Sequence, residues 1–268
     1  MESKHRLHPS LILTLIIALA LAACSPIRAT PLPATPTQTP TPSPTATVQW
    51  FPPTATLTPQ ALVAPTATPV YLPGLGNEIF SDNFASSARW NTASSDAGSV
   101  GISRNRITIA VKAPETTLFS LRSEPLLGDF YAEINAHPAL CRGGDSYGLL
   151  FRANGLDSYR YVLACDGTVR LEVKKAYNRP RVLAGPAPSG DAPPGSPGDV
   201  RLGVWAVGAE MRFFLNGRHQ FTLTDRNFPA GTLGVFVQSA ETSSATTVTF
   251  SELVVQSVSY ISPTPTIT

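Results

Sequence analysis

Half of the 26 prolines in this 268-residue chain lie in one stretch that can form neither helix nor sheet. Residues 25–76 hold 13 Pro and 12 Thr, and Arg28 is their only charged residue. Proline fixes φ and lacks the backbone N–H that helices and sheets need. We therefore expect residues 24–76 to be a disordered, extended and solvated linker, and the Pro/Thr tail 260–268 to be disordered as well. A folded domain is expected between them, at 77–259.

The chain begins with a short basic segment and an uncharged apolar run. Lys4 and Arg6 precede residues 11–23, which read LILTLIIALALAA. Thirteen residues form about 20 Å of helix, which is shorter than the roughly 30 Å hydrocarbon core of a bilayer. Residues 1–23 are therefore predicted to be a signal peptide rather than a permanent membrane span.

The apolar run ends in Leu21-Ala22-Ala23-Cys24, which resembles the lipobox of bacterial lipoproteins. The resemblance implies cleavage before Cys24, attachment of diacylglycerol to its sulfur, and acylation of the new amine, for instance by palmitate. Several acyl chains hold a protein stably on a membrane, whereas one does so only marginally. We expect an extracytoplasmic protein that is anchored to a bacterial membrane through Cys24. An ordinary secretory signal followed by an unmodified cysteine is the alternative.

Residues 77–259 show the short alternating segments and turn signals of β-strands, with no helical period. Two hairpins are the clearest, because Asp166-Gly167 and Asn216-Gly217 favour the positive φ angles of tight turns. Ten or more antiparallel strands without helices predict an all-β sandwich or barrel. Residues 184–199, with five Pro and four Gly, predict an irregular surface loop. The strands are expected at 99–102, 107–111, 119–122, 130–137, 147–153, 159–165, 169–173, 200–207, 211–215, 218–223, 232–238 and 246–255.

Several motifs follow one another in a recognisable order. In chain order they are Phe80-Ser-Asp-Asn-Phe84, Asp145-Ser-Tyr-Gly-Leu-Leu-Phe-Arg152, Tyr159-Arg-Tyr161, Phe213-Phe-Leu-Asn-Gly217, Gly231-Thr-Leu-Gly234 and Val248-Thr-Phe250. This order resembles the concanavalin A-like lectin and glucanase domains, with their laminin G-like and 3-keto-disaccharide hydrolase cousins. The resemblance implies a jelly roll, a two-sheet antiparallel sandwich in which the first and last strands pair.

Two cysteines remain once Cys24 carries lipid, so Cys141 and Cys165 have only one possible pairing. Because an exported domain meets an oxidising environment, a disulfide is predicted. We expect strands 130–137, 147–153 and 159–165 to form a meander, with the loop that carries Cys141 folding across the middle strand. A zinc site that adds His137 to both cysteines is the alternative, although it lacks an evident fourth ligand.

One polar face is a candidate binding surface. Alternation places the three polar side chains of strand 130–137 on one side. In the expected meander, Glu133, Arg152 and Arg160 would form a row across three strands. Such a row is either a solvated face with cross-strand charge pairs or the floor of a sugar-binding concavity. Trp205 is either an aromatic platform for a sugar or a core residue. The candidate ligand-binding residues are Glu133, Asn135, His137, Arg152, Arg160 and Trp205.

The sequence contains no recognised catalytic constellation. A glycoside hydrolase needs two carboxylates about 5 to 9 Å apart, and glucanases carry them as Glu-x-Asp-x-(x)-Glu on one strand. Strand 130–137 offers the single carboxylate of Glu133, and no nucleophile elbow or phosphate-binding loop is present. We assign no catalytic residue. No cofactor is expected beyond a structural Ca²⁺, for which Asp82, Asp145 and Glu252 are candidate ligands.

The formal net charge of +2 gives no reason to expect a nucleic-acid partner. The sequence favours a surface-anchored lipoprotein that presents a non-catalytic β-sandwich, with a carbohydrate or another cell-envelope polymer as its partner. Two alternatives use the same fold. One is a glycoside or keto-sugar hydrolase, and the other is a protein–protein assembly module. The chain is therefore not assigned as an enzyme.

Overall fold

A computed structural model describes residues 70–243 and 245–261 of the chain. The predicted signal peptide, Cys24, the linker as far as residue 69 and the tail beyond 261 lie outside these residues. The described part contains strands and no helix, and so no helix that could cross a membrane. The predicted all-β class is confirmed. The strands are β1 (Leu75–Asp82), β2 (Ala93–Ser95), β3 (Gly98–Ser103), β4 (Arg106–Val111), β5 (Thr117–Leu121), β6 (Phe130–Leu140), β7 (Ser146–Asn154), β8 (Asp157–Ala164), β9 (Thr168–Lys174), β10 (Arg181–Pro188), β11 (Val200–Val207), β12 (Glu210–Leu215), β13 (Arg218–Thr224), β14 (Thr232–Gln238) and β15 (Thr246–Val258).

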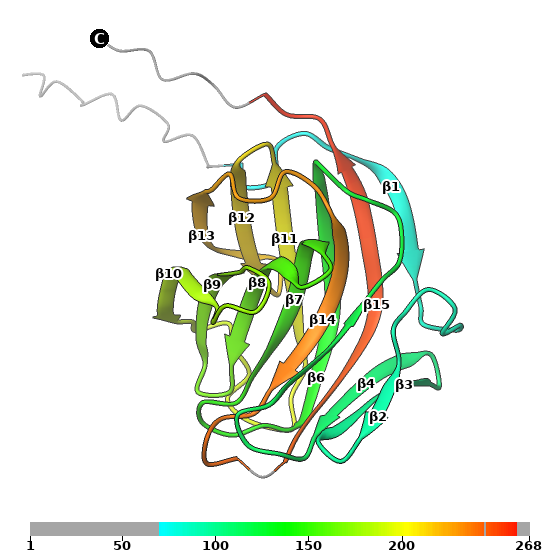
Figure 1. Cartoon of the computed structure of the whole chain (residues 1–268). Coiled ribbons are helices and arrows are strands. Elements are labelled where there is room, and N and C mark those ends of the chain that lie inside the picture. The colour runs from blue at the N-terminus through cyan, green and yellow to red at the C-terminus, as the bar shows by residue number, and fades with distance from the viewer. Residues whose placement is uncertain (1–69, 244, 262–268) are drawn as a thin grey trace, which may run out of the picture. The chain divides into compact units, whose positions relative to one another are not determined.

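The strands form two antiparallel sheets that pack face to face (Figure 1). The nine-stranded sheet has the order β13-β12-β11-β6-β15-β4-β3-β2, and β1 also pairs with β15. The six-stranded sheet has the order β10-β9-β8-β7-β14-β5. The first and last strands do pair, from Leu75 opposite Val258 to Asp82 opposite Leu253. The two-sheet sandwich that the sequence predicts is therefore confirmed.

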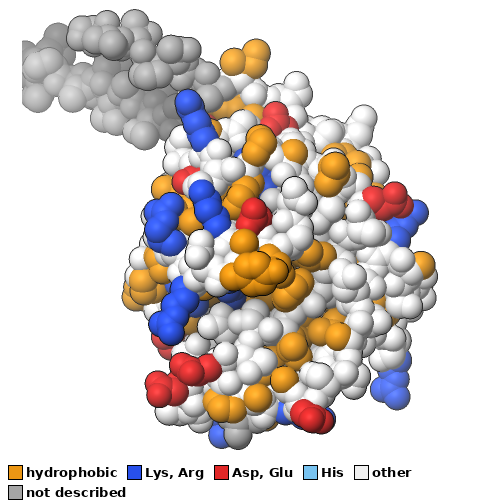
Figure 2. Space-filling model, viewed as in Figure 1, with side chains coloured by type: hydrophobic (Ala, Val, Ile, Leu, Met, Phe, Trp, Pro, Cys, Tyr) orange, Lys and Arg blue, Asp and Glu red, His pale blue; other side chains and the backbone are white. Residues whose placement is uncertain are grey.

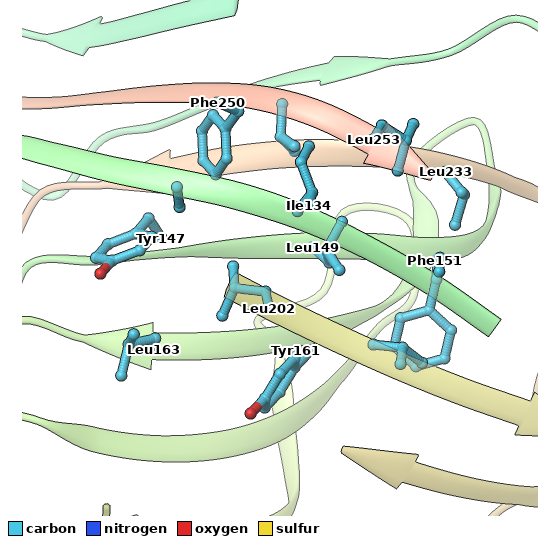
Figure 3. Packing of buried hydrophobic residues seen from close by; sticks show 14 of the residues in the cluster. Ile134, Tyr147, Leu149, Phe151, Tyr161, Leu163, Leu202, Leu233, Phe250 and Leu253 are labelled. Atoms are coloured by element: carbon cyan, nitrogen blue, oxygen red, sulfur yellow. The ribbon is translucent and has the colours of Figure 1, made fainter. Parts of the chain in front are cut away.

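The core fills the space between the two sheets (Figure 3). Period-2 alternation sends every second side chain inward, as in β6, where Ile134 is fully buried while Glu133 is half-buried on the other face. Aromatic rings join the layers, since Tyr147 of β7 and Phe250 of β15 have centroids 6.5 Å apart. Burying side chains of this size contributes roughly 1.5–3 kcal/mol each.

Both predicted hairpins are present. β8 pairs with β9 beyond the Asp166-Gly167 turn, and β12 pairs with β13 around Asn216-Gly217. At the second turn both central residues have positive φ, 50° for Asn216 and 76° for Gly217. This is the backbone conformation that an Asn-Gly pair adopts at little cost, so the local sequence fixes the turn.

The predicted meander of three neighbouring strands is wrong. β6 lies in the nine-stranded sheet, whereas β7 and β8 lie in the six-stranded sheet. The segment between Leu140 and Ser146 is thus a crossing from one layer to the other. Alternation alone cannot distinguish the two cases, because an inward-facing residue looks the same in either sheet. The predicted irregular loop 184–199 is also partly wrong, since β10 extends to Pro188 and pairs with β9 along one edge.

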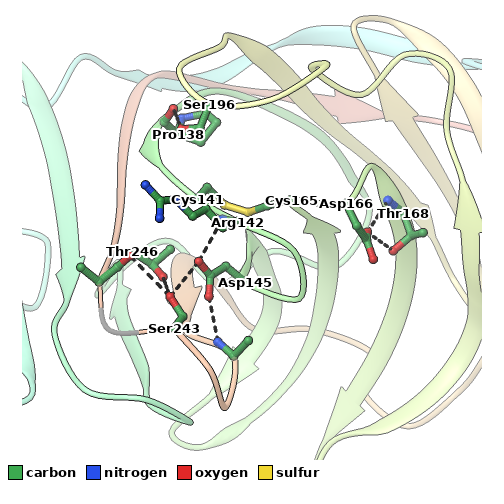
Figure 4. Close-up of a disulfide and its surroundings, with 12 residues drawn as sticks. Pro138, Cys141, Arg142, Asp145, Cys165, Asp166, Thr168, Ser196, Ser243 and Thr246 are labelled. Atoms are coloured by element: carbon green, nitrogen blue, oxygen red, sulfur yellow. Dashed lines mark hydrogen bonds between the residues drawn. A yellow bond between two sulfur atoms is a disulfide. The ribbon is translucent and has the colours of Figure 1, made fainter. Parts of the chain in front are cut away.

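The disulfide links the two layers (Figure 4). Cys141 follows β6 and Cys165 follows β8, and their Cα atoms are 5.7 Å apart. Closing the loop of 24 residues stabilises the fold by roughly 3 kcal/mol in the chain-entropy account. The pairing consumes both thiols, which excludes the alternative zinc site. His137 instead contacts Asp199, with 2.9 Å between Nδ1 and Oδ1.

Candidate functional site

The outer face of the six-stranded sheet carries a groove of about 620 Å³. Its floor comes from β5, β7, β8, β9 and β14, and loops next to β5, β8, β9 and β14 form its ends. Figure 2 shows this side of the molecule, with apolar side chains gathered near the middle of the face and Lys and Arg side chains toward the β9–β10 side. A groove with an apolar centre and charged borders is a common form of ligand site.

The middle of the floor is apolar. Leu150, Val162 and Phe236 form a cluster separate from the main core. Beside them Phe119 of β5 keeps 39% of its surface exposed. A glycine allows this layering, because a Cβ on Gly148 would lie 1.8 Å from the carbonyl oxygen of Tyr161 and 3.1 Å from the Phe236 ring. The groove therefore offers the partly exposed ring of Phe119 beside an apolar layer in which Phe236 is fully buried.

A fixed charged row crosses this floor. Arg160 lies over the Phe236 ring, with 4.2 Å from Cζ to the centroid, and its Nη2 donates to Gln238 Oε1 at 2.8 Å. Its Nε lies 3.5 Å from Glu172 Oε2, and Arg170 Nε donates to Glu172 Oε1 at 2.6 Å. Burial lowers the pKa of Arg160 and the Glu172 carboxylate opposes that effect, so the guanidinium stays charged. Because both ends of the row are held, it presents oriented polar groups.

Two buried atoms in this row have no hydrogen-bond partner. Arg160 Nε and Glu172 Oε2 face each other only as an ion pair, although both residues are more than nine-tenths buried. Orphaned polar atoms of this kind are costly in a folded protein and often mark functional places. Glu172, Gln238, Phe119 and Phe236 were not among the sequence candidates. The signal for Phe236 is its place within Leu-Gly-Val-Phe-Val, where apolar residues occupy both faces of the strand.

Of the six sequence candidates, Arg160 alone lines the groove. Glu133, Asn135 and His137 lie together on the opposite side of the molecule, on the outer face of the nine-stranded sheet. The predicted row that joins Glu133, Arg152 and Arg160 is wrong, because these residues belong to two sheets. Within β7 and β8, moreover, the residue opposite Arg160 is Leu150.

The outer face of the nine-stranded sheet is a network of polar contacts. Arg201 donates to Asn135 at 3.2 Å and lies 3.4 Å from the Glu133 carboxylate. Asn135 Nδ2 donates to Glu252 at 2.6 Å, and Tyr131 donates to Glu133 at 2.6 Å. A second depression of about 440 Å³ opens there. Its lining has no aromatic residue, and is made by Asn135, Asp199, Val200, Arg201, Asn216, Gly217 and Ser251.

Trp205 is fully buried on this same face, so it offers no platform to a ligand. Its indole Nε1 donates to the carbonyl oxygen of Pro73 at 3.1 Å, and the Tyr260 ring packs against it at 5.5 Å. Arg212 lies 4.6 Å above the indole. The residues that cover Trp205 thus come from both ends of the described chain.

The chain contacts the sandwich from residue 70, which is earlier than the predicted boundary at 77. Arg212 Nη1 donates to the carbonyl oxygens of Val70 and Tyr71, both at 3.1 Å. The Tyr71 ring stacks on His219 with 4.1 Å between centroids. Burial lowers the pKa of His219, and the nearby charge of Arg212 lowers it further. We call residues 70–74 the strap.

Arg152 is buried and hydrogen-bonded to the backbone, so it stabilises the fold and does not face the groove. Its backbone φ is 48°, at a bulge in β7, and its side chain is 1% exposed. The guanidinium donates to the carbonyl oxygens of Gly128, Gly208 and Phe228 at 2.7 to 3.2 Å, and lies 3.7 Å from the Asp129 carboxylate. It therefore ties together three loops at one end of the sandwich.

The three candidate calcium ligands lie in separate hydrogen-bond networks. Asp82 accepts from Phe84 N, Trp90 Nε1 and Arg122 Nε. Asp145 accepts from Arg142 N at 3.0 Å, Ala240 N at 2.9 Å and the Ser243 hydroxyl at 3.0 Å, which fixes the loop beside the disulfide (Figure 4). Within residues 70–243 and 245–261, His, Cys, Asp and Glu form no group of three that could hold a metal ion.

The groove also lacks the glucanase arrangement of carboxylates. On the outer face of β9, Glu172 stands between Arg170 and Lys174 rather than beside another acid. The other groove carboxylates, Glu115 and Glu241, come from loops. Glu172 contacts two arginines and no second acid, so the floor lacks the pair of carboxylates that a glycosidase uses.

Comparisons with known proteins connect this chain only to solved structures, since no family model and no curated protein matches it. The catalytic domain of an endo-1,3-β-glucanase (laminarinase) from Thermotoga petrophila has a TM-score of 0.50 at 10% identity, over 69% of this chain and 99% of that chain. The neighbours are concanavalin A-like jelly rolls. This chain shares their fold.

Two further neighbours have other names. One comes from work on endo-acting O-glycanases of the human gut microbiota that initiate mucin breakdown, with a TM-score of 0.50, 9% identity, and coverage of 68% of this chain and 100% of that chain. The other is the carbohydrate-binding module CBM66 from Bacillus subtilis, with a TM-score of 0.48, 20% identity, and coverage of 63% and 95%. At such identities the likeness concerns the fold.

Proposed function

We propose that this chain is an extracytoplasmic lipoprotein that is anchored through Cys24 and presents a non-catalytic, glycan-binding β-sandwich. The groove on the six-stranded sheet is the binding site. The observation that carries the proposal is the combination of an exposed aromatic side chain, Phe119, with the fixed polar row of Arg160, Gln238 and Glu172. Sugar rings present apolar C–H faces and hydroxyl edges, so such a site fits both parts.

The fold supports a glycan over other ligands. Two neighbours with a TM-score of 0.50 are named for enzymes that act on polysaccharides or O-glycans. Binding is favoured over hydrolysis because the groove floor holds one carboxylate, Glu172, in contact with Arg160 and Arg170. A retaining or inverting glycosidase needs a second carboxylate across the scissile bond, with one of the two protonated.

Replacing Phe119 by Ala should weaken glycan binding about tenfold, since aromatic anchors of binding sites contribute more than 1 kcal/mol. The measurement is affinity electrophoresis of the full chain, purified in a non-ionic detergent, through gels that contain laminarin, mucin O-glycans or other polysaccharides. Asn135→Ala, on the opposite face, is the matched control and should change affinity less than about twofold.

Three outcomes of this experiment would count against the proposal. Loss of binding in Asn135→Ala but not in Phe119→Ala would place the site on the nine-stranded sheet. Release of glycan fragments that Glu172→Gln abolishes would identify a hydrolase. A protein partner that copurifies while every glycan passes unbound would identify an assembly module.

The anchor has its own test. Cys24→Ser should move the protein from the detergent phase to the aqueous phase in Triton X-114 partition, and should abolish incorporation of labelled palmitate. The physical reason is that each buried CH₂ of an acyl chain contributes about 0.8 kcal/mol to membrane binding. If the wild-type protein incorporated no labelled palmitate and stayed in the aqueous phase, lipid anchoring would be contradicted. The proposal for the groove would not be affected.

A further inference from the structure

The charges that line the groove are separated along its length. Lys174 and Arg179 lie at the end where β8 begins, because Lys174 is opposite Ser158 in the sheet. Glu115 and Glu241 line the other end, close to Gln238, which is opposite Ser146 at the start of β7. A ligand that lies along the strands therefore meets a basic end and an acidic end.

The basic end includes more residues than the two that line the groove. β8, β9 and the loop from β9 to β10 carry five basic residues and two acidic ones. Both carboxylates are engaged, since Asp157 accepts from the Ala176 backbone N–H and Glu172 contacts Arg160 and Arg170. The basic residues are Arg160, Arg170, Lys174, Lys175 and Arg179. We call Lys174, Lys175 and Arg179 the basic loop.

The basic loop has hydrogen-bond donors that no described residue engages. Lys174 Nζ donates to the carbonyl oxygen of Asn178, whereas Arg179 is exposed and its guanidinium has no ion pair or hydrogen bond to any described residue. Tyr177, between them, is 92% exposed, so an aromatic ring and an open guanidinium project from one short loop. A guanidinium binds carboxylate, phosphate or sulfate through two parallel hydrogen bonds.

We propose that the groove selects an acidic glycan, with the anionic substituent of one sugar bound at Lys174 and Arg179 and a neutral sugar lying over the exposed part of Phe119. This inference rests on the proposed glycan-binding function and names its substrate class. Charge complementarity commits the basic end to an anion. Next to the basic end, the exposed ring of Phe119 can stack against the apolar face of a sugar ring, and it offers no partner to a second charge.

The acidic end of the groove limits which acidic glycans can bind. Glu115 and Glu241 would repel a ligand that carries a negative charge on every unit. A glycan in which acidic sugars alternate with neutral ones can place its charge at the basic loop and a neutral residue at the acidic end. A nucleic acid or a uniformly charged polyuronate cannot, and the groove should discriminate against both.

The test uses the full chain, purified in a non-ionic detergent, and compares ligands that differ only in charge. The probes are hyaluronan oligosaccharides, in which glucuronate alternates with a neutral amino sugar, and the same oligosaccharides after carboxyl reduction. We expect the reduced form to bind at least about tenfold more weakly, because a charge-assisted bidentate contact is lost. A sulfated oligosaccharide of equal spacing distinguishes recognition of carboxylate from recognition of any anion.

Charge reversal in the basic loop supplies the matched variant. Arg179→Glu should weaken binding of the acidic oligosaccharide at least about tenfold and leave the reduced form unchanged. Arg106→Glu, an equal charge reversal at an exposed position in β4 of the other sheet, should change neither by more than about twofold. Equal thermal midpoints of the two variants would exclude unfolding as the cause.

Each other result has a definite meaning. Equal binding of the acidic and reduced oligosaccharides, with Phe119→Ala still weakening both, would overturn the acidic preference and keep the proposed function. No retention of any acidic or neutral glycan would overturn the proposed function and this inference with it. Binding to anionic phospholipid vesicles that depends on Arg179, without binding to any glycan, would replace the inference with a membrane contact.

Discussion

Replacement of Arg152 by Leu should destabilise the domain by about 3–5 kcal/mol, because it removes the charged donor of three backbone carbonyl oxygens and each one left without a partner costs roughly 1–3 kcal/mol. The side chain is 1% exposed and supplies donors to the carbonyl oxygens of Gly128, Gly208 and Phe228. Leucine fills part of the volume but leaves three carbonyls without a partner, and Asp129 without a counter-charge. Denaturant unfolding of the variant, followed by circular dichroism, measures the loss.

Arg201→Leu is the matched control for this experiment. Arg201 also contacts a carboxylate and a side-chain oxygen, but its side chain is 55% exposed, so water replaces the lost bonds. We expect its free energy of unfolding to change by less than about 1 kcal/mol. A loss below about 1 kcal/mol in Arg152→Leu would mean that the three carbonyls find other partners, and the description of Arg152 as a structural tie would fail.

This expectation changes how Arg152 is interpreted. Its position in the sequence made it a candidate for ligand contact, because strict alternation along β7 would aim it at the outer face. A bulge between Phe151 and Asn154 interrupts the alternation and gives Arg152 a positive φ. A loss of glycan binding in an Arg152 variant would therefore report unfolding and not the position of the ligand.

Features with a local cause could be predicted from the sequence. The Asn216-Gly217 turn is one example, since its positive φ angles are preferences of those two residues. The strands around it follow from alternation, because one face of each is buried in the core. The pairing of Cys141 with Cys165 follows from counting, once Cys24 is set aside.

Features that depend on contacts between distant segments could not be predicted in this way. Nothing in residues 141–145 distinguishes a hairpin from a crossing between sheets. For this reason the sequence predicted Glu133 beside Arg152 and Arg160, which lie in the other sheet. The groove was missed for a related reason. Phe119 and Phe236 become neighbours only because β14 pairs with β5, which lies far away in the sequence. The charged partner of Arg160 becomes evident only when the β8–β9 register places Glu172 opposite it.

A chain that begins at Leu75 should be less stable than one that begins at Val70, by about 2–4 kcal/mol, although β1 is complete in both. The shorter chain loses the strap. Trp205 then loses its hydrogen bond to Pro73, Arg212 loses two backbone acceptors, and His219 loses the stacked Tyr71 ring. Thermal unfolding of the two chains measures the difference in stability.

Tryptophan fluorescence locates the change. In the shorter chain the emission of Trp205 should move to longer wavelength and become more sensitive to acrylamide, because its indole meets water. In a Trp205→Phe background the truncation should leave the emission of the remaining Trp90, which is 6% exposed, unchanged. Equal unfolding midpoints and equal emission in the wild-type background would show that the strap contributes nothing.

The strap lies in the segment that composition assigns to the linker, although the apolar patch Val70-Tyr71-Leu72 interrupts the Pro/Thr pattern there. Pro73 lacks an N–H, and composition therefore assigned residues 70–74 to the linker. Its carbonyl oxygen still accepts a hydrogen bond. The indole N–H of Trp205, which lies on the face of the sheet, requires such an acceptor. A proline-rich segment cannot build a ladder, but it can cover an aromatic side chain that a neighbouring sheet leaves exposed. The boundary of the fold is therefore set by the side chain that requires covering, and it lies before the first strand.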